Sequence, residues 1–175
     1  MDPLSLVISA LALLFSVAAF FWQHLRKSDS IICTLVANEV KGNIGYFQFS
    51  VANIGSQSAL LRNISVNIFM KKELHGTFMD DSTASDLPKV VRPGEIVPVT
   101  VKSSWSDEFI ESAARETPDA DIHLFFVANV VLWNPEGSRL TGSKEVATLK
   151  MARDRKSWTY AAASERSFRC VRKRR

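Results

Sequence analysis

The sequence predicts an all-β domain, an antiparallel β-sandwich, preceded by one N-terminal transmembrane helix and interrupted by one short helical insertion. Three observations support this prediction: a long apolar run near the N-terminus, an alternating hydrophobic pattern after it, and turn residues between the alternating segments. Hydrophobic residues make up 46% and charged residues 23% of the 175 residues, the composition of a packed globular chain. This composition excludes a wholly disordered or collagen-like protein.

Charge separates three parts of the chain. No acid, lysine or arginine occurs from Pro3 to Leu25, whereas Arg153 to Arg175 hold nine Lys or Arg against two acids, a balance of +7. Since the whole chain carries +4, the remainder carries 4 − 7 = −3, so the basic character belongs to the C-terminal segment. We therefore divide the chain into an N-terminal transmembrane anchor (1–27), a β-sandwich domain (28–153) and a basic C-terminal tail (154–175).

The anchor is the run from Leu4 to Trp22. Its 19 residues, rising about 1.5 Å each as a helix, cover roughly 30 Å, the thickness of the hydrocarbon core of a bilayer. A cleaved signal peptide is the first alternative, but it needs a positive segment before the run and small residues at its end, where Phe20 and Phe21 stand instead. A buried core helix, the second alternative, is normally shorter and carries a polar stripe. We expect one membrane span.

Residues at the end of the run fit a membrane interface. Trp22 ends an aromatic group, and Arg26 and Lys27 follow it closely as interfacial anchors. Because basic residues follow the span and none precedes it, the positive-inside rule places the C-terminal domain in the cytoplasm and the N-terminus outside. The expected localisation is the cell membrane, with a single pass and the membrane as an integral partner.

One face of the predicted span is made of small or polar residues. These recur at spacings of three and four, and therefore share a helical face: Ser5, Ser9, Ala12, Ser16, Ala19 and Gln23. Small faces let helices approach closely in lipid, and Ser or Gln can hydrogen-bond across the contact. The face indicates self-association through the span. The alternative is that Ser and Ala are simply common in spans.

Beyond residue 28 the hydrophobic period becomes two. In the segment 46–53, Phe47, Phe49 and Val51 point to one face and the residues between them to the other, the pattern of a half-buried strand. Six or seven short strands of this kind predict two antiparallel sheets packed face to face. The other candidate strands lie at 31–35, 64–70, 97–101, 124–128 and 145–151, and turn residues lie at 41–43, 53–56, 92–95 and 134–137.

Two further features refine the sandwich. A helical insertion is expected after Ser106, a candidate N-cap followed by two acids and a short apolar stripe, and Pro118 ends it. This helix is expected to close one end of the sandwich. Pro98 interrupts a strand pattern and lacks an amide hydrogen, which predicts that its strand lies at an edge or carries a bulge.

Several of these segments together resemble a known class of protein. They are FWQHLRKSDS at the end of the span, FQFSVANIG at 47–55, ALL at 59–61 and VVRPGE at 90–95. From Leu4 to Met151 the chain resembles small uncharacterised bacterial single-span membrane proteins with an immunoglobulin-like β-sandwich domain. The resemblance implies that fold, which hosts many unrelated functions, and it implies no catalytic residue.

No motif in the sequence points to catalysis, to a metal or to a cofactor, and we expect none of the three. The three histidines are far apart, His123 is expected to be a strand residue, and HExxH, CxxC and glycine-rich phosphate loops are absent. Cys33 and Cys170 are expected to be free thiols in a cytoplasm. The acidic segment 80–86 invites a calcium site but lacks the EF-hand spacing, so a solvated loop is expected.

The basic tail contains the strongest remaining signal. From Trp158 onward its apolar residues fall roughly on one helical face among arginines, as in segments that lie on anionic membranes. The residues expected to meet anionic lipid are Arg166, Arg169, Arg172, Lys173, Arg174 and Arg175. A solvated basic end is one alternative. Binding to nucleic acid, which any Lys/Arg-rich run can support, is the less favoured one.

These observations favour a membrane-anchored binding or scaffolding module that is not an enzyme and whose protein partner the sequence does not identify. A subunit of an oligomeric membrane complex is a second interpretation, and an enzyme with a site built from distant loops is a third. A deep pocket with convergent polar groups would favour the enzyme, and a flat apolar patch would favour the binder.

Overall fold

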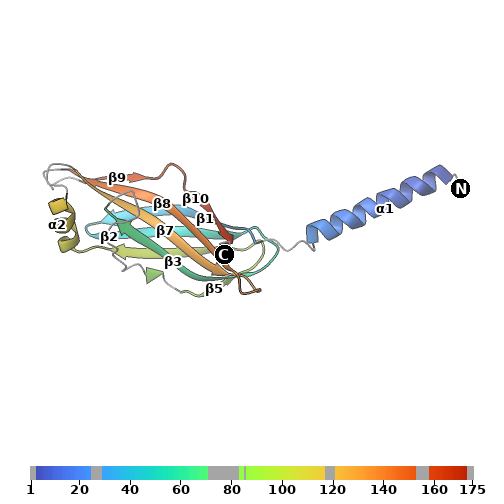
Figure 1. Cartoon of the computed structure of the whole chain (residues 1–175), viewed down its shortest axis with the longest axis horizontal. Helices are drawn as coiled ribbons and strands as arrows, with labels where there is room; N and C mark the ends of the chain where they lie inside the picture. Colours follow the sequence, from blue (N-terminus) through green and yellow to red (C-terminus); the bar gives the residue numbers. More distant parts are fainter. Residues whose placement is uncertain are drawn as a thin grey trace.

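The computed structural model of the chain describes residues 3–24, 29–70, 83–84, 86–116, 121–152 and 158–172. Within these residues there are two helices and ten strands (Figure 1). The helices are α1 (Pro3–His24) and α2 (Asp107–Glu116). The strands are β1 (Ile31–Lys41), β2 (Ile44–Asn53), β3 (Ala59–Phe69), β4 (Thr83–Ala84), β5 (Lys89–Val91), β6 (Ile96–Ser104), β7 (Ile122–Trp133), β8 (Arg139–Met151), β9 (Trp158–Ala162) and β10 (Ser167–Arg172).

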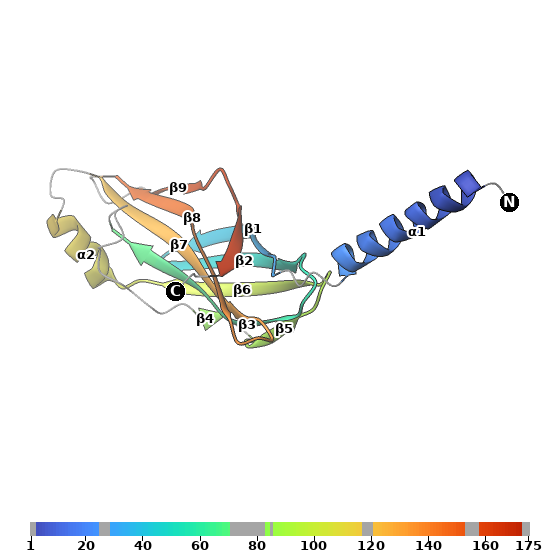
Figure 2. The same cartoon turned by 45° about the vertical axis from the view of Figure 1, so that its right-hand side comes forward.

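The ten strands pair antiparallel in one sheet. Its order is β4-β6-β2-β1-β10-β8-β7-β3-β5, with β9 paired to β8 beside this path. The sheet curls until β3 lies against β6, so it forms a nearly closed barrel (Figures 1 and 2). The all-β antiparallel class is as predicted, but the immunoglobulin-like sandwich of two separate sheets is wrong.

The strand that joins the two halves of the barrel is β10. It pairs with β1 from Ile31 to Thr34, and with β8 through Val171 and Arg172. Phe168 and Cys170 point into the core, and β8 approaches them so closely that a Cβ at Gly142 would lie 2.9 Å from the Phe168 ring. The sandwich prediction failed because residues assigned to a separate tail supply this joining strand.

The C-terminal segment therefore differs from the predicted helical tail. Residues 158–172 form β9 and β10, and the boundary at residue 153 divides one continuous sheet. The apolar spacing in β10 has a period of two, since Phe168 and Cys170 are buried while Arg169 and Val171 are exposed. The apolar residues of β10 therefore follow the two-residue period of a strand and not the helical face that the sequence analysis predicts.

The core follows the predicted alternation. Phe47, Phe49 and Val51 are fully buried, while Gln48 between them is exposed. The ring centroids of Phe47 and Phe126 lie 5.4 Å apart across the barrel interior, and those of Trp105 and Phe126 lie 5.6 Å apart. Pairs of this kind add roughly 0.5–1.5 kcal/mol beyond the apolar area that they bury.

The predicted helical insertion is confirmed as α2. Its N-cap is Ser106, whose side-chain oxygen accepts a hydrogen bond from the Phe109 amide at 3.2 Å. Phe109 and Ala114 face the core and are buried. The helix lies at one end of the barrel (Figure 1), where its buried residues belong to the core.

Helix α1 is the element on which the membrane predictions rested. Among the residues that the structure describes, no helix is both long and apolar enough to cross a bilayer. On this finding the predicted single-span anchor is wrong. The single-pass cell-membrane localisation, with the N-terminus outside, is wrong with it.

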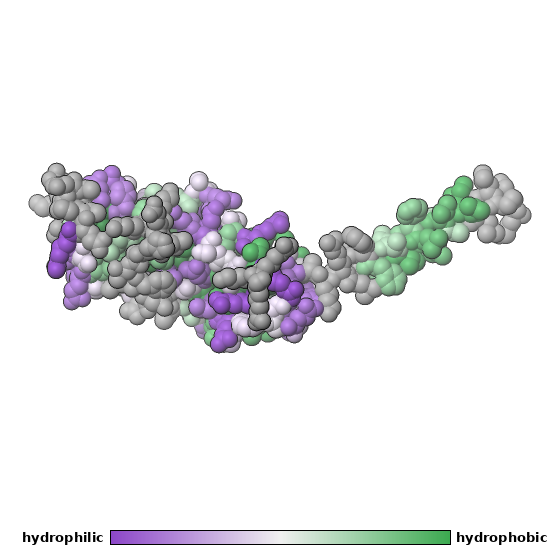
Figure 3. Space-filling view, in the orientation of Figure 1, coloured by the Kyte–Doolittle hydropathy of each residue, from purple (hydrophilic) through white to green (hydrophobic). Residues whose placement is uncertain are grey.

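The described side chains of α1 are exposed. Its apolar surface contrasts with the more polar barrel face seen in the same view (Figure 3). Phe15 is 74% exposed, and the other large apolar residues on this surface are Val7, Ile8, Leu11, Leu13, Leu14, Val17, Phe20 and Phe21.

A candidate binding site where the barrel wall is unpaired

The barrel wall is interrupted at two places, and the first is between β3 and β6. Here the buried Ser103 hydroxyl of β6 donates a hydrogen bond to the Val66 carbonyl oxygen of β3 at 3.0 Å. The short strands β4 and β5 pair along β6 and β3 respectively, and Leu87 between them packs against the core. We call this place the β3–β6 seam. Although β3 and β6 are not paired as strands, the seam is bridged and covered.

Pro98 lies on the β6 side of this seam. Strand β4 pairs only with Val101 and Lys102 of β6, so Pro98 lies on a stretch that β4 leaves uncovered. A proline there removes an amide donor that an unpaired edge would otherwise expose. The prediction that Pro98 marks an edge is confirmed.

The second interruption lies between β1 and β9. After β9 the chain crosses from β8 to β1: the Ala163 amide donates to the Val146 carbonyl at 3.0 Å, and the Leu35 amide donates to the Arg166 carbonyl at 2.8 Å. Strand β10 then occupies the wall beside residues 31–34 of β1 (Figure 2). Beyond Leu35, no described strand pairs with this side of β1. We call this unpaired part of the wall, residues 36–41 and 158–162, the β1–β9 break.

Both strands that border the crossing carry a bulge there. In β1 the register with β2 shifts between Leu35 and Ala37, which leaves Val36 as the extra residue, 56% exposed. In β8 the register with β7 shifts so that Val146 has no partner between Glu145 and Ala147. Bulges bend strands and re-aim side chains, and they are common next to functional sites.

Each strand at the break has one polar side chain on its inner face. Asn38 of β1 is the cross-strand partner of Phe47, and Tyr160 of β9 is the cross-strand partner of Leu149. Cross-strand partners share a face. Because the partners Phe47 and Leu149 are buried, Asn38 and Tyr160 point toward the barrel interior from opposite sides of the break.

These two side chains end in buried atoms that have no hydrogen-bond partner, Nδ2 of Asn38 and the hydroxyl of Tyr160. The buried Trp105 indole Nε1, near the same end of the barrel, also has none. All three atoms are hydrogen-bond donors. An unpaired buried polar group costs about 1–3 kcal/mol, so each one calls for a reason.

The electrostatics of the break keep Tyr160 neutral. Burial raises the pKa of Tyr160 to about 12, and the Arg166 guanidinium acts in the opposite direction. Tyr160 is therefore a protonated donor at neutral pH, with a cation close enough to influence it. Glu165, which directly precedes Arg166 in the chain, accepts a hydrogen bond from Lys144. This bond lowers the pKa of the Glu165 carboxyl.

The thiols are not suited to nucleophilic chemistry. Cys33 and Cys170 are free and buried on the neighbouring strands β1 and β10. Burial raises the pKa of Cys170 to about 12. Burial also raises the pKa of Cys33 well above its usual range, and the nearby Cys170 adds a smaller increase. Since the thiolate is the reactive form, both side chains act as small core residues.

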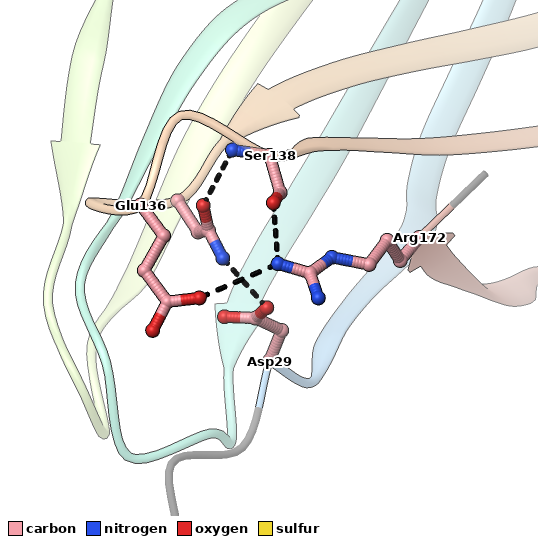
Figure 4. A network of polar contacts seen from close by, with 5 residues as sticks. Asp29, Glu136, Ser138 and Arg172 are labelled. Carbon is pink, nitrogen blue, oxygen red and sulfur yellow. Dashed lines mark hydrogen bonds and ion pairs between the residues drawn. The ribbon is translucent and has the colours of Figure 1, made fainter. Parts of the chain in front are cut away.

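A second polar cluster lies at the other end of the barrel (Figure 4). The buried Asn134 donates to Asp29 at 2.9 Å and accepts from the Ser138 amide at 2.7 Å. Arg172 of β10 contacts the Ser138 hydroxyl and lies 3.4 Å from Glu136. These contacts tie the start of the domain and the β7–β8 turn to the C-terminal strand. Arg172 is paired with Glu136 and Asp29 is hydrogen-bonded to Asn134, so the cluster holds the fold together.

Buried Asn53 makes a similar tie at the same end. Its Nδ2 donates to the carbonyls of Gln57 at 2.7 Å and Val91 at 2.9 Å, and its Oδ1 accepts from the Gly55 amide at 3.0 Å. The loops at this end are therefore fixed, in contrast to the unpaired donors at the β1–β9 break.

The predicted helix-pairing residues lie on α1, partly within the described side chains. Ser9, Ala12, Ser16 and Ala19 are exposed, and the Ser16 hydroxyl donates to the Ala12 carbonyl within the helix at 2.8 Å. The side chains of Ser5, Trp22 and Gln23, and the residues Arg26 and Lys27, lie outside the described part.

The predicted lipid-binding arginines are separated by the sheet. Arg166 lies in the crossing beside the β1–β9 break, Arg169 is exposed on β10, and Arg172 belongs to the polar cluster of Figure 4. The structure therefore does not bring these three together as one basic face. Lys173, Arg174 and Arg175 lie outside the described residues.

The described residues contain no group of three or more His, Cys, Asp or Glu side chains placed to hold a metal ion. His123 is exposed on β7 and stacks on Phe125 with 6.3 Å between the ring centroids. The acidic segment 80–86 lies mostly outside the described residues, and Asp86 pairs with Lys89 at 3.9 Å.

The sequence did not reveal the β1–β9 break, but it contained a signal for it. The alternation of Ile31, Cys33 and Leu35 loses its phase at Val36, after which the polar Asn38 takes an inward position. A loss of phase within a strand is the mark of a bulge. The sequence did not predict the strand on the other side of the break, because the residues of β9 belong to the segment predicted to be a basic tail.

Comparison with known proteins adds no family. No family model matches the chain, and no curated protein matches it. Among solved structures, the X-ray structure of Northeast Structural Genomics Consortium target SoR45 is similar over 77% of this chain and 84% of that chain, with 10% identity and a TM-score of 0.39. This likeness carries no functional information. The resemblance to bacterial single-span proteins is not tested by these comparisons.

Proposed function

We propose that the chain is a non-catalytic binding module whose barrel takes up a ligand at the β1–β9 break. The observation that carries the proposal is the pair of buried donors, Asn38 Nδ2 and the Tyr160 hydroxyl, which flank the unpaired wall and have no partner. A ligand that accepts hydrogen bonds from both would remove the cost of leaving them unpaired.

The surroundings of the break support a preformed site. Binding sites work best on rigid elements, and here both donors are on strands, one paired with β2 and the other with β8. The closed β3–β6 seam, the helix α2 and the tie at Asn53 hold the rest of the barrel in shape. The ligand would therefore meet donors that are already positioned.

A second candidate function is self-assembly through α1. Its support is the exposure of large apolar side chains along the helix, among them Leu13 at 67% and Phe15 at 74%. Extended apolar surfaces of this kind usually have a partner that covers them. The molar mass of the full chain in solution, measured by light scattering, distinguishes a monomer from an assembly. Leu14→Glu should dissociate an assembly held by α1.

The binding function is tested by the melting temperature of the full chain against a panel of small acids, alcohols, amines and short peptides. A ligand present at ten times its Kd should stabilise the folded state by about 1.4 kcal/mol. Asn38→Leu should abolish the stabilisation, while Gln48→Leu, on the outer face of β2, should preserve it. A ligand whose effect survives Asn38→Leu binds elsewhere and contradicts the assignment.

A further inference from the structure

The side of β1 that faces the break is an exposed strand edge. On its other side β1 pairs with β2 as far as Lys41, whereas on this side its pairing with β10 ends at Thr34. None of the described main-chain hydrogen bonds outside the paired strands involves residues 36–41. Val36 and Lys41, at the two ends of this stretch, are exposed. An edge of this kind can pair with one further strand.

The β1–β2 hairpin determines which main-chain groups of this edge face the break. Its loop has two residues, and Lys41 pairs with Ile44 across it. Residues that flank a two-residue loop form a hydrogen-bonded pair, and such pairs alternate with non-bonded pairs along an antiparallel ladder. Every second residue of β1, counted back from Lys41, therefore bonds to β2. The amide and carbonyl groups of the residues between them, Asn38 and Val40, face the break.

The side chains of the same two residues point inward. Val40 packs against the core, and Asn38, opposite the buried Phe47, has an Nδ2 donor that is buried without a partner. A strand that pairs with this edge places one side chain directly opposite each of them on the inner face. An apolar side chain matches Val40, and a side chain with an amide or hydroxyl oxygen can accept the Asn38 donor.

The outer face of the edge carries two opposite charges. The side chains of Glu39 and Lys41 are 59% and 69% exposed, and they form an ion pair at 3.0 Å. All described strand pairs of the sheet are antiparallel, so an added strand is expected to run antiparallel to β1. In such a strand the residue opposite Lys41 precedes the residue opposite Glu39. An acidic residue followed by a basic one therefore places opposite charges across the pair.

We propose that the ligand of the β1–β9 break is a short extended peptide segment that pairs antiparallel with residues 37–41 of β1 as an additional strand. From its N-terminus, the segment has an acidic residue opposite Lys41, an apolar residue opposite Val40, a basic residue opposite Glu39, and Asn, Gln, Ser or Thr opposite Asn38. Main-chain bonds to Val40 and Asn38 supply the affinity, and the side chains supply the selectivity. This inference rests on the proposed binding function and adds the chemical class of the ligand.

The first test uses the full chain and the peptide acetyl-Glu-Val-Lys-Asn-Thr-amide, with the affinity measured by isothermal titration calorimetry. In the proposed register the amides of the peptide Val and Asn face β1. N-methylation of either one should weaken binding by about tenfold, because it removes a main-chain hydrogen bond. The matched control is N-methylation of the peptide Lys, whose amide faces away from β1. This control should bind within about twofold of the parent peptide.

The second test changes the edge itself. Val40→Pro removes the amide that faces the break and no bond to β2, so the chain should fold and bind the peptide about tenfold more weakly. Val40→Ala, the matched control, keeps this amide and should bind within about threefold of the unmodified chain.

A charge exchange keeps the proposal testable if Val40→Pro does not fold. The double variant Glu39→Lys, Lys41→Glu should prefer acetyl-Lys-Val-Glu-Asn-Thr-amide over the first peptide by about threefold, the reverse of the preference of the unmodified chain.

Four results would overturn the proposal, and they differ in what they leave standing. If the peptide fails to bind while a small molecule of the panel binds in a way that depends on Asn38, the peptide class is wrong and the binding function remains. If neither binds, both proposals fail. If the three N-methylated peptides bind alike, or the charge preference does not reverse, the peptide does not use this edge in the proposed register. If the unmodified chain is a dimer and Val40→Pro a monomer, the edge pairs with a second copy of the chain instead.

Discussion

The two interruptions of the barrel wall use the same residue types in opposite ways. At the β3–β6 seam, the Ser103 hydroxyl is buried and bonded to the Val66 carbonyl, so the wall is closed by a side chain. At the β1–β9 break, the Tyr160 side chain is partly buried, and its buried hydroxyl has no partner. A bonded hydroxyl stabilises the fold, whereas an unbonded one costs free energy. The contrast concerns these two hydroxyls alone, because Asn67 of β3 also has a buried side-chain oxygen without a hydrogen-bond partner.

The comparison also explains where the fold is firmly held. The seam is covered by β4, β5 and Leu87, and the opposite rim is tied by Asn53 and the Arg172 cluster. The break, in contrast, is bordered by two bulges and by a crossing of the chain. Proteins tolerate such unfavourable local features mainly where function requires them.

The largest predicted effect is on β10, the strand that limits the break. Phe168→Ala should lower the free energy of unfolding by about 3–5 kcal/mol, because it removes a buried ring that packs against Gly142. Arg169→Ala, on the outer face of the same strand, should change it by less than about 0.5 kcal/mol. Urea denaturation of the full chain measures both. Equal effects would show that β10 is not packed into the barrel, and a Phe168→Leu variant keeps the test available if the alanine variant does not fold.

The next effect concerns the closure of the β3–β6 seam. Ser103→Ala should cost about 1–2 kcal/mol, because it leaves the Val66 carbonyl buried without its donor. The neighbouring Ser104→Ala removes a hydroxyl that lies on the outer side of β6 and should cost little. Amide exchange should become faster in β3 for Ser103→Ala alone. Unchanged stability would mean that the seam does not depend on this bond.

Alkaline pH should weaken the fold through buried groups whose pKa is raised. The pKa of Cys170 rises from 9.0 to about 12 and that of Tyr160 from 10.0 to about 12, so the folded state holds both protons more tightly than the unfolded state. Their contribution to stability is complete below pH 9 and is lost as pH rises toward 12. Melting temperatures at pH 8, 10 and 11 measure the loss. The double variant Cys170→Ala, Tyr160→Phe should reduce this dependence, and Cys33, whose pKa is also raised by burial, should account for the part that remains. A slope unchanged from the parent chain would assign the dependence to other groups.

The smallest effect is predicted at the break itself, and it has the opposite sign to that of Ser103→Ala. Tyr160→Phe removes an unbonded buried hydroxyl, so it should leave stability unchanged or raise it by up to about 1 kcal/mol. Tyr46→Phe, at an exposed site, is the matched control and should be neutral. A loss of more than 1 kcal/mol in Tyr160→Phe would reveal a hydrogen bond at this hydroxyl and remove the basis of the comparison.

The sequence predicted the local parts of this fold well and its closure poorly. The inward positions of Phe47, Phe49 and Val51, the cap at Ser106 and the edge at Pro98 follow from period, capping and backbone chemistry, which act within a few residues. The pairing of β10 with β1 joins residues more than a hundred positions apart. No local pattern encodes such a contact. In addition, the many arginines around β10 favoured the interpretation of this segment as a basic tail.

The candidate site was hidden for a related reason. Asn38 lies on β1 and Tyr160 on β9, and the chain crosses from β8 to β1 between β9 and β10. In the sequence, Asn38 is one polar residue in a strand and Tyr160 one aromatic residue in a basic segment. The proposed role of these two residues depends on the unpaired part of the barrel wall, and that part is a property of the complete sheet.

The central claim is that the β1–β9 break, and not the β3–β6 seam, receives the ligand. Hydrogen–deuterium exchange of the full chain tests it most directly, with the ligand that gives the largest rise in melting temperature and without it. We predict slower exchange for amides at 36–41 and 158–162, and no change at 63–69 and 96–100. Protection confined to β3 and β6, or to α1, with no change at the break, would contradict the claim.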